Sequence, residues 1–403
     1  MDYAEIDPYI ERMLVGEKDI LTAYPFSHMC ETSGTVGKQK LVPLTDRQTA
    51  VFMKYNRRYN DGFLAKHLPE QWMEGRAFAT AEGTHHTAPS GITLGSASSV
   101  MAQSINGGKE ALGKMMSILY TSPIEASIPE PGTKTIYLHT RFALMDRGIT
   151  GVISGFYVQT LQMFRYIADN YEMLINDIEQ GSIDDSVMIP DDIRASILGR
   201  LEPMPERAAE LREIFKDGSD HPFVRKIWPK LTYIQGVGGD GFSVYARTIE
   251  ESFTGGGVHN IYSGIIASEG LWSVPVELES EDSALAPGSA FMEFLPVEAG
   301  DDFSRCVTMD KLEVGKTYEL IITNLCGYYR YRMSDAVKVT GYYNKTPRVR
   351  FMYRVNKTVN MVGEKTTEKA LPTEKRSKAK ASEIRSLCFL QIPTISKTSN
   401  AAF

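Results

Sequence analysis

The stretch "ETSGTVGKQKLVPLT", residues 31–45, places two glycines and several small hydroxylated residues directly before an apolar, strand-like run. Glycines let the main chain approach a ligand closely, and consecutive backbone N–H groups in such a turn form a concave site for anions. Hydroxyl and ammonium groups add hydrogen-bond donors for phosphate oxygens. The donors of this kind are Thr32, Ser33, Thr35, Lys38 and Lys40. Taken alone, the stretch fits a phosphate-binding loop and a plain polar turn equally well.

The spacing of these glycines differs from that of the P-loop, because Gly34 and Gly37 enclose only two residues and the P-loop has four. A second stretch, "GVGGDG" at 236–241, does match the dinucleotide pattern G-x-G-x-x-G. That pattern should follow a buried apolar strand and be closed by a later acidic residue. The preceding "WPKLTYIQ" is mixed in character, and no suitable acidic residue follows. We therefore predict a turn at 236–241.

Two further stretches carry groups suited to a nucleotide. Ser268 and Glu269 follow an apolar run in "IYSGIIASEGLW" (261–272), and a hydroxyl beside a carboxylate can serve a phosphate and its Mg²⁺. In "NLCGYYRYRMSDAVKVTG" (324–341), Arg330, Arg332 and Asp335 lie where two expected strands meet. A carboxylate there can accept hydrogen bonds from both hydroxyls of a ribose. The alternatives are a capped turn for the first stretch and a surface ion pair for the second.

The composition is that of an ordinary globular protein and limits the classes of partner. The 403 residues carry a net charge of −6 with a pI near 5.8, which argues against nucleic acid or an anionic membrane as the main partner. The four cysteines form no C-x-x-C pair, which is typical of buried thiols in a reduced compartment. The doublet His85-His86 disfavours a metal site, because neighbours on a strand point to opposite faces. No signal-like segment or membrane-length apolar run occurs, so we expect a cytoplasmic protein.

Hydrophobic periodicity predicts helices at 1–20 (ending near Gly16), 46–67 and 155–178. After residue 230 the chain changes to strand-like segments rich in β-branched and aromatic residues, at 291–298, 317–323 and 335–343. Helices before and strands after predict an α/β or α+β core whose sheets join distant parts of the chain. The basic and polar residues after 371 cannot build a second core, so we expect a disordered tail there.

In their order and spacing, the three nucleotide-type stretches resemble the signatures of the adenylate-forming superfamily. More closely, the chain resembles the auxin-responsive family of acyl acid amido synthetases, which act on acids such as indole-acetic and jasmonic acid. The resemblance runs from the first residues to about residue 371. It rests on "LTAYPFSHMCETSGTVGKQKLVPLT", "IWPKL", "ASEG", "FMEFLPVE", "TYELIITNLCGYYRYRMSDAVKVTG" and "FMYRVNKTVNMVGEKTTE".

The resemblance implies a fold and a domain organisation. The fold would be mixed α/β, that of the large N-terminal domain of adenylate-forming, firefly-luciferase-like enzymes. Residues 1–362 would form this domain without its first segment, and residues 363–403 a hinge remnant and a divergent, disordered tail. The small C-terminal domain, which closes over the site in the family, would then be largely missing.

The resemblance also implies a reaction and its participants. Family members join a carboxylic acid, often a hormone acid, to an amino acid in two steps. ATP and the acid first give an acyl-AMP and pyrophosphate, and the amine then displaces AMP. The expected cofactors are ATP and Mg²⁺, and the expected partners are a small carboxylic acid and an amino acid. We expect a monomer that binds neither nucleic acid nor membrane.

Site residues can be carried over from the family position by position. Lys40, Glu269 and Lys365 match catalytic positions, with Glu269 also at the metal and Lys365 reaching the adenylate near the hinge. The nucleotide-binding positions are Thr32, Ser33, Gly34, Thr35, Gly37, Ser268, Asp335 and Arg354. Among these, Ser268 would lie at the α-phosphate and Asp335 at the ribose. Lys38 falls on a variable position that we expect to face solvent.

The expected acid site lies beside the helical region, with residues 87–98, Tyr137 and Phe164 as candidates.

Two positions depart from the family's pattern. The aromatic residue expected to flank adenine falls at Ile265, with Tyr262 nearby but off register, and the glycine expected before the ribose aspartate is Ser334. Two alternatives to the amido synthetase therefore stay open. One is a truncated, non-catalytic relative that binds nucleotide or acyl acid without turnover, and the other is an enzyme that passes its acyl-adenylate to a thiol.

Overall fold

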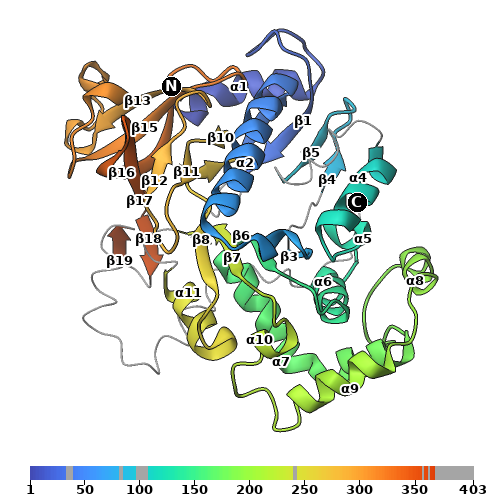
Figure 1. The fold of residues 1–403 in the computed structure, drawn as a ribbon. Helices are drawn as coiled ribbons and strands as arrows, with labels where there is room; N and C mark the ends of the chain where they lie inside the picture. The colour runs from blue at the N-terminus through green and yellow to red at the C-terminus, as the bar shows by residue number, and fades with distance from the viewer. Residues whose placement is uncertain are drawn as a thin grey trace. The chain divides into compact units, whose positions relative to one another are not determined.

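A computed structural model describes residues 1–32, 40–80, 85–96, 108–238, 243–355, 358–361 and 364–367 (Figure 1). The chain divides into two compact units, Met1–Met352 and Tyr353–Phe403. The boundary expected between residues 362 and 363 falls outside the described residues and stays a prediction, as does the disordered tail.

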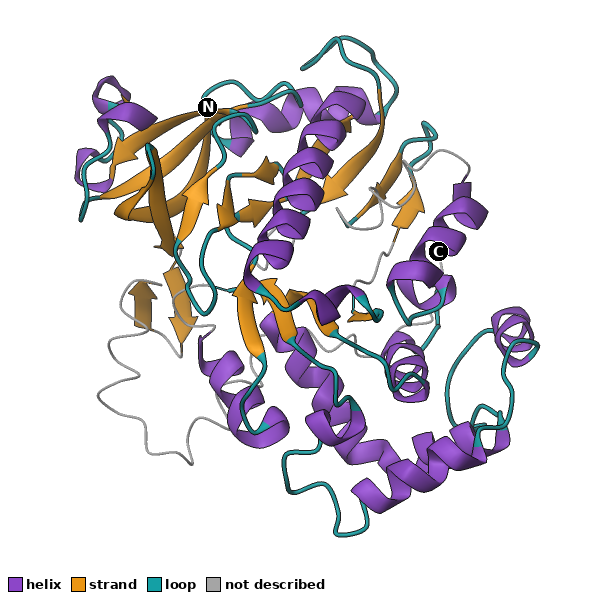
Figure 2. Ribbon diagram, in the orientation of Figure 1, coloured by secondary structure: helices purple, strands orange, loops and turns teal. Residues whose placement is uncertain are grey.

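Long helices lie in the first two thirds of the chain (Figure 2). The helices are α1 (Tyr3–Leu14), α2 (Asp46–His67), α4 (Gly108–Leu119), α5 (Ile124–Ser127), α6 (Thr135–Met145), α7 (Tyr157–Gln180), α8 (Asp191–Leu198), α9 (Pro205–Ile214), α10 (Val224–Ile227) and α11 (Ser243–Ile249). The three predicted helices correspond to α1, α2 and α7, so these predictions are confirmed.

Local chemistry explains where these helices begin and end. Asp2 caps α1 in a reciprocal pair with Glu5, and the helix ends before Gly16, whose φ of +95° favours glycine. The Thr45 side chain caps α2 by accepting a hydrogen bond from the backbone N–H of Gln48. A left-handed glycine, Gly181, ends α7.

A parallel sheet has the strand order β3-β6-β7-β8 and joins segments that lie far apart in the sequence. Its strands are β3 (Ala77–Ala79), β6 (Gly151–Phe156), β7 (Tyr233–Val237) and β8 (His259–Tyr262). The long helix α7 packs against β6 and β7, and α6, α9 and α11 pack on α7. The buried core here includes Phe78, Phe164 and Trp228.

An antiparallel region follows, in a seven-stranded sheet of order β11-β12-β17-β16-β15-β13-β14. Its strands are β11 (Ser273–Pro275), β12 (Ser283–Leu285), β13 (Phe291–Pro296), β14 (Val307–Thr308), β15 (Thr317–Thr323), β16 (Tyr331–Tyr343) and β17 (Thr346–Arg354). Strands β13, β15 and β16 confirm the three predicted strands. The expected mixed α/β fold with sheets from distant segments is therefore confirmed.

The remaining strands form smaller sheets. A four-stranded sheet has the order β2-β1-β5-β4, and β9 pairs with β10, and β18 with β19. Their bounds are β1 (Phe26–Glu31), β2 (Leu41–Thr45), β4 (His85–Thr87), β5 (Thr93–Gly95), β9 (Ile266–Ala267), β10 (Gly270–Leu271), β18 (Thr358–Met361) and β19 (Glu364–Thr367). The last two belong to the second unit.

Two expectations from the sequence differ from the structure. Before residue 230, where the sequence indicated only the strand-like run that is β2, further strands occur, and β3, β4 and β5 have three residues each, too few for a two-residue periodicity to stand out. At the glycine-rich residues 236–241, for which we predicted a turn, the buried strand β7 runs through Gly236 to Val237 and α11 begins at Ser243. The residues before these glycines did not look like a buried strand, because the strand contains polar side chains. Tyr233 and Gln235 are nevertheless buried in the sheet. Residues 239–242 lie outside the described residues.

In the part of the chain that the structure describes, no helix has both the length and the apolarity needed to cross a bilayer. The three cysteines described are free thiols; Cys30 and Cys326 are buried, as expected, whereas Cys306 is only half-buried.

We predict that Phe164→Ala lowers the free energy of unfolding by about 3–5 kcal/mol, because it leaves a cavity in a packed core. Phe164 is fully buried, with its ring centroid 5.8 Å from that of Phe253. The matched control is Phe291→Ala, since that side chain is 59% exposed, and its effect should stay within about 0.5 kcal/mol. Urea denaturation followed by circular dichroism measures both. Equal losses in the two variants would contradict the assignment of Phe164 to the core.

His139 should make stability depend on acid pH. Burial lowers the pKa of this fully buried imidazole to about 4, partly opposed by the backbone of Ala126. Between pH 6.5 and 4 the unfolded chain binds a proton at His139 that the folded chain does not, so stability falls as pH falls through this range. The loss should be about 3 kcal/mol and should level off below the folded pKa.

Denaturation of the wild type and His139→Gln at pH 7 and pH 4 tests this, because the carboxylates contribute equally to both proteins. The wild type should lose more stability than the variant between the two pH values. The same loss in both proteins would show that His139 is not the titrating group.

Candidate functional site

The ends of the glycine-rich loop lie together at the start of β2. The backbone N–H of Thr32 donates to the carbonyl of Lys40 over 2.9 Å. The Thr32 hydroxyl is buried and has no hydrogen-bond partner among the described residues, so it could donate to a ligand. Loop residues 33–39, which include the predicted Ser33, Gly34, Thr35 and Gly37 and the variable Lys38, lie outside the described residues.

The side chain of Lys40 is held between aromatic rings. Its ammonium donates to the hydroxyl of Tyr331 over 3.3 Å. It also lies 5.3 Å from the ring centroid of Tyr3 and 5.9 Å from that of Tyr331, within the range of cation–π attraction. Lys40 is therefore directed toward β16 by side chains from two distant parts of the sequence.

Two tyrosines hold the backbone next to Lys40. The N–H of Leu41 donates to the hydroxyl of Tyr3 over 2.7 Å, and the hydroxyl of Tyr328 donates to the Leu41 carbonyl over 3.1 Å. Tyr328 is fully buried, with its ring centroid 4.7 Å from that of Tyr331. The base of the loop is thus fixed to α1 on one side and to the segment before β16 on the other.

Ser268 and Glu269 form the two-residue turn between β9 and β10, where Ala267 pairs with Gly270. Glu269 is 7% exposed. Its carbonyl accepts a hydrogen bond from the Asn324 side chain over 3.0 Å, and the Asn324 side-chain oxygen accepts from the N–H of Cys326 over 3.0 Å. The loop after β15 therefore holds the backbone of Glu269 in place.

Asp335 lies in β16 at a bulge, where the pairing register with β15 shifts between Glu319 and Ile321. Its side chain is buried, at 4% exposed. The preceding Ser334 has a φ of +61°, the left-handed conformation that glycine adopts without steric cost. This explains why the family has glycine at this position, and serine here should cost roughly 1 kcal/mol.

Tyr331 lies where these groups meet. Burial raises the pKa of its hydroxyl well above the usual value, and the nearby Glu269, Tyr3, Asp335 and Asp2 raise it further. Tyr331 therefore stays neutral at physiological pH and can accept a hydrogen bond from the Lys40 ammonium. Lys40 contacts Tyr331, and the carboxylates of Glu269 and Asp335 lie near enough to raise the pKa of Tyr331, while the roles predicted for these three residues stay predictions.

The two arginines in the same segment form ion pairs, but the pair of Arg332 with the buried Glu319 is not the surface pair that the alternative interpretation expected. Arg330 pairs with Glu293 over 2.9 Å and Arg332 with Glu319 over 2.7 Å.

Arg354 ends β17, and Lys365 pairs with Asn360 across β18 and β19. Both residues belong to the second unit, and their roles stay predictions.

Other sequence candidates lie in the core. Tyr137 is fully buried and donates to Asp177 over 2.6 Å, and Phe164 is fully buried among aromatic rings. Neither side chain faces an open surface, which corrects the expectation that they line the acid site. Ile265 is also buried in the core, and Tyr262 packs at 5.2 Å from the ring of Tyr157.

Sequence reasoning missed Asn324, Tyr3 and Tyr331. The one available signal was the density of aromatic residues in "CGYYRYR" (326–332), which exceeds what a surface turn needs.

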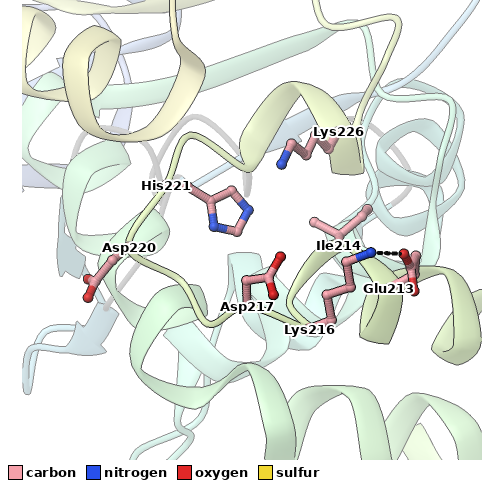
Figure 3. A pocket seen from close by; sticks show the side chains of 7 residues that line it. All are labelled: Glu213, Ile214, Lys216, Asp217, Asp220, His221 and Lys226. Atoms are coloured by element: carbon pink, nitrogen blue, oxygen red, sulfur yellow. Dashed lines mark hydrogen bonds and ion pairs between the residues drawn. The ribbon is translucent and has the colours of Figure 1, made fainter.

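A separate pocket of about 660 Å³ opens near α9 and α10 (Figure 3). Its lining residues are Glu213, Ile214, Lys216, Asp217, Asp220, His221 and Lys226. None of them belongs to the groups that meet at Tyr331, so we do not assign this pocket to the site.

We predict that Gly270→Ala lowers the free energy of unfolding by about 1–3 kcal/mol, because the added methyl group overpacks the turn. A Cβ at this position would lie 2.7 Å from Cη2 of the buried Trp272. Gly341→Ala is the matched control, since no atom lies within 4 Å of a Cβ there. Thermal denaturation of the two variants compares them, and an unchanged midpoint for Gly270→Ala would contradict this packing.

Comparisons with known proteins bear on the family and the fold. Models of the GH3 family N-terminal domain and of the GH3 family central domain match residues 1–258 and 283–354. The indole-3-acetic acid-amido synthetase GH3.17 of Arabidopsis thaliana is 28% identical over 92% of this chain and 64% of its own length. The jasmonoyl–L-amino acid synthetase GH3.5 of Oryza sativa subsp. japonica is 25% identical over 91% of this chain and 65% of its own length.

The solved structure of GH3.15 acyl acid amido synthetase shares the fold, with a TM-score of 0.78 and 23% identity, over 94% of this chain and 65% of that one. A structure of AtGH3.15 in complex with 2,4-DB has a TM-score of 0.77 and 24% identity, over 93% of this chain and 64% of that one. The chain thus spans slightly less than two thirds of the length of these relatives. With both family models matching and the fold shared, the chain belongs to the GH3 family.

Proposed function

We propose that the chain is an ATP-dependent acyl acid amido synthetase that adenylates a hormone-like carboxylic acid and conjugates it to an amino acid. The observation that carries this proposal is the contact of Lys40 with Tyr331, whose pKa the nearby carboxylates of Glu269 and Asp335 raise. These groups come from three stretches, with Lys40 229 positions before Glu269 and Glu269 66 positions before Asp335, in the order that the family's nucleotide signatures have. Relatives named as amido synthetases of indole-3-acetic acid and jasmonic acid support the same reaction class.

Each residue has a role that its surroundings suit. Lys40 and the hydroxyl of Thr32 would bind the triphosphate, because one is a cation and the other a buried donor with no hydrogen-bond partner among the described residues. Asp335 would accept the ribose hydroxyls with its two carboxylate oxygens, and its burial would strengthen these hydrogen bonds. Ser268 at the hairpin turn would contact the α-phosphate.

The residues present also fit Mg²⁺, which in nucleotide enzymes is bound by one or two carboxylates together with substrate phosphates. Glu269 is a buried carboxylate beside Ser268 and would hold the ion. Among the described residues, no group of three histidine, cysteine or acidic side chains could hold a metal without the substrate. The bound ion would neutralise phosphate charge during the reaction.

In the first step, a carboxylate oxygen of the acid attacks the α-phosphorus of ATP, and the bond to pyrophosphate breaks. Negative charge then moves onto the leaving pyrophosphate, where the fixed ammonium of Lys40 would stabilise it. In the second step, the amine nitrogen attacks the acyl carbon, AMP leaves, and the nitrogen loses a proton. No covalent bond to the protein is needed.

The acid would bind near residues 87–98, where β4 and β5 form a hairpin, although residues 97 and 98 lie outside the described ones. The carboxylic acid and the amino acid are the partners that this reaction needs.

The test is pyrophosphate release by the purified chain with Mg-ATP and a panel of indole, jasmonate-like and benzoate acids. Acid-dependent release should fall by about 10²–10³ in Lys40→Ala, the usual loss for removing one group that stabilises developing charge. The matched control is Lys338→Ala, because Lys338 is exposed and has no predicted role at the site. It should keep the wild-type rate.

The other outcomes separate the alternatives. No release from a folded protein that still binds ATP would favour a non-catalytic relative. Release followed by AMP formation that requires a thiol, and not an amino acid, would favour a thioester-forming enzyme. AMP formation that requires an amino acid supports the amido synthetase.

A further inference from the structure

We infer that Tyr331 is a positioning residue that directs the Lys40 ammonium at the triphosphate, so that its hydroxyl matters for binding ATP and not for binding AMP. This inference rests on the proposed function. The family resemblance assigned no role to Tyr331.

The first ground is the contact itself. The Tyr331 hydroxyl lies 3.3 Å from Nζ of Lys40, and the two residues are 291 positions apart in the sequence. The ring centroid of Tyr331 lies 5.9 Å from the Lys40 ammonium. The ring centroid of Tyr3, which belongs to α1, lies 5.3 Å from the same ammonium. Lys40 is thus held by one hydroxyl and two rings.

The second ground is that Tyr331 cannot easily move. Its side chain is 1% exposed, and its backbone pairs with Ile322 across β15 and β16. Its ring lies 4.7 Å from that of Tyr328, which is itself hydrogen-bonded to the backbone of Leu41. The hydroxyl is therefore a fixed point to which the ammonium can be oriented.

The third ground is the flexibility of the Lys40 side chain. A lysine side chain has four rotatable bonds, so its ammonium is found at one place only when contacts hold it there. The backbone of Lys40 is fixed by its hydrogen bond to Thr32 and by the contacts of the adjacent Leu41. The hydroxyl of Tyr331 supplies the remaining constraint, at the end of the side chain.

The carboxylates of Glu269 and Asp335 explain why the Lys40 ammonium needs to be held by Tyr331. Glu269 and Asp335 lie close enough to Tyr331 to raise its pKa. A loosely held ammonium next to two buried carboxylates would be drawn toward them by Coulomb attraction. A hydrogen bond to a neutral hydroxyl instead keeps the lysine available for phosphate oxygens.

The experiment is isothermal titration calorimetry of Mg-ATP and of AMP, without acid or amino acid, against the full chain. The variants are Tyr331→Phe, Lys40→Ala, the double variant, and Tyr342→Phe as control. Phenylalanine keeps the ring and removes only the hydroxyl. Tyr342 is a suitable control because it lies on the same strand and its hydroxyl donates to the backbone of Leu312 over 2.8 Å.

We expect Tyr331→Phe to weaken ATP binding by about three- to tenfold, the range for one lost hydrogen bond. AMP has no β- or γ-phosphate for Lys40 to contact, so its affinity should stay within about twofold. The double variant should bind ATP no more weakly than Lys40→Ala, because Tyr331 acts through Lys40. Tyr342→Phe should bind both nucleotides as the wild type does.

Three results would overturn the inference while leaving the proposed function standing, provided that Lys40→Ala weakens ATP binding. These are unchanged ATP binding in Tyr331→Phe, equal weakening of ATP and AMP, and additive losses in the double variant. If Lys40→Ala leaves ATP binding unchanged, or if the wild type binds neither nucleotide, the nucleotide site of the proposed function is wrong and the inference with it.

Discussion

The segment from Asn324 to Asp335 is the constraint on which the candidate site depends, because it contacts both Glu269 and Lys40. The side chain of Asn324 binds the carbonyl of Glu269, and the Tyr331 hydroxyl accepts from the ammonium of Lys40. Asp335 lies on the same strand. Three nucleotide-type groups are therefore positioned by one continuous piece of chain, so a shift in the pairing of β15 and β16 would misplace all of them together.

This arrangement lowers stability locally. Buried carboxylates at Glu269 and Asp335 lose hydration, and Ser334 occupies a conformation that disfavours side chains. The surrounding core compensates, since Trp272 and Tyr328 are both fully buried next to these groups. Polar groups are buried, and a residue other than glycine adopts a left-handed conformation, at the place where the polar groups converge. Such local departures from favourable packing and backbone geometry are expected of a functional site.

Most long elements could be predicted from the sequence, because α2 and α7 bury one face and β15 is rich in β-branched and aromatic residues. Short strands such as β3 could not, since three residues show no periodicity. Lys40, Glu269 and Asp335 were found through the family resemblance, and composition alone left each of them ambiguous. The contact of Lys40 with Tyr331 could not be predicted, because it depends on how strands 291 residues apart are arranged.

The formal charges of Lys40, Glu269 and Asp335 indicate that binding a triphosphate here would need additional positive charge. Lys40 contributes one positive charge, and Glu269 and Asp335 contribute two negative charges, so these three groups together repel a triphosphate. At the low effective dielectric of buried groups, such repulsion is stronger than it would be in water. Binding a polyanion here therefore requires positive charge from another source, and a divalent cation held by Glu269 would reverse the sign of the site. The charge balance also explains why the position of Lys40 matters, because Lys40 is the single cation among these three residues. If its ammonium were not held in place, it would pair with the carboxylates and leave the phosphate charge unneutralised.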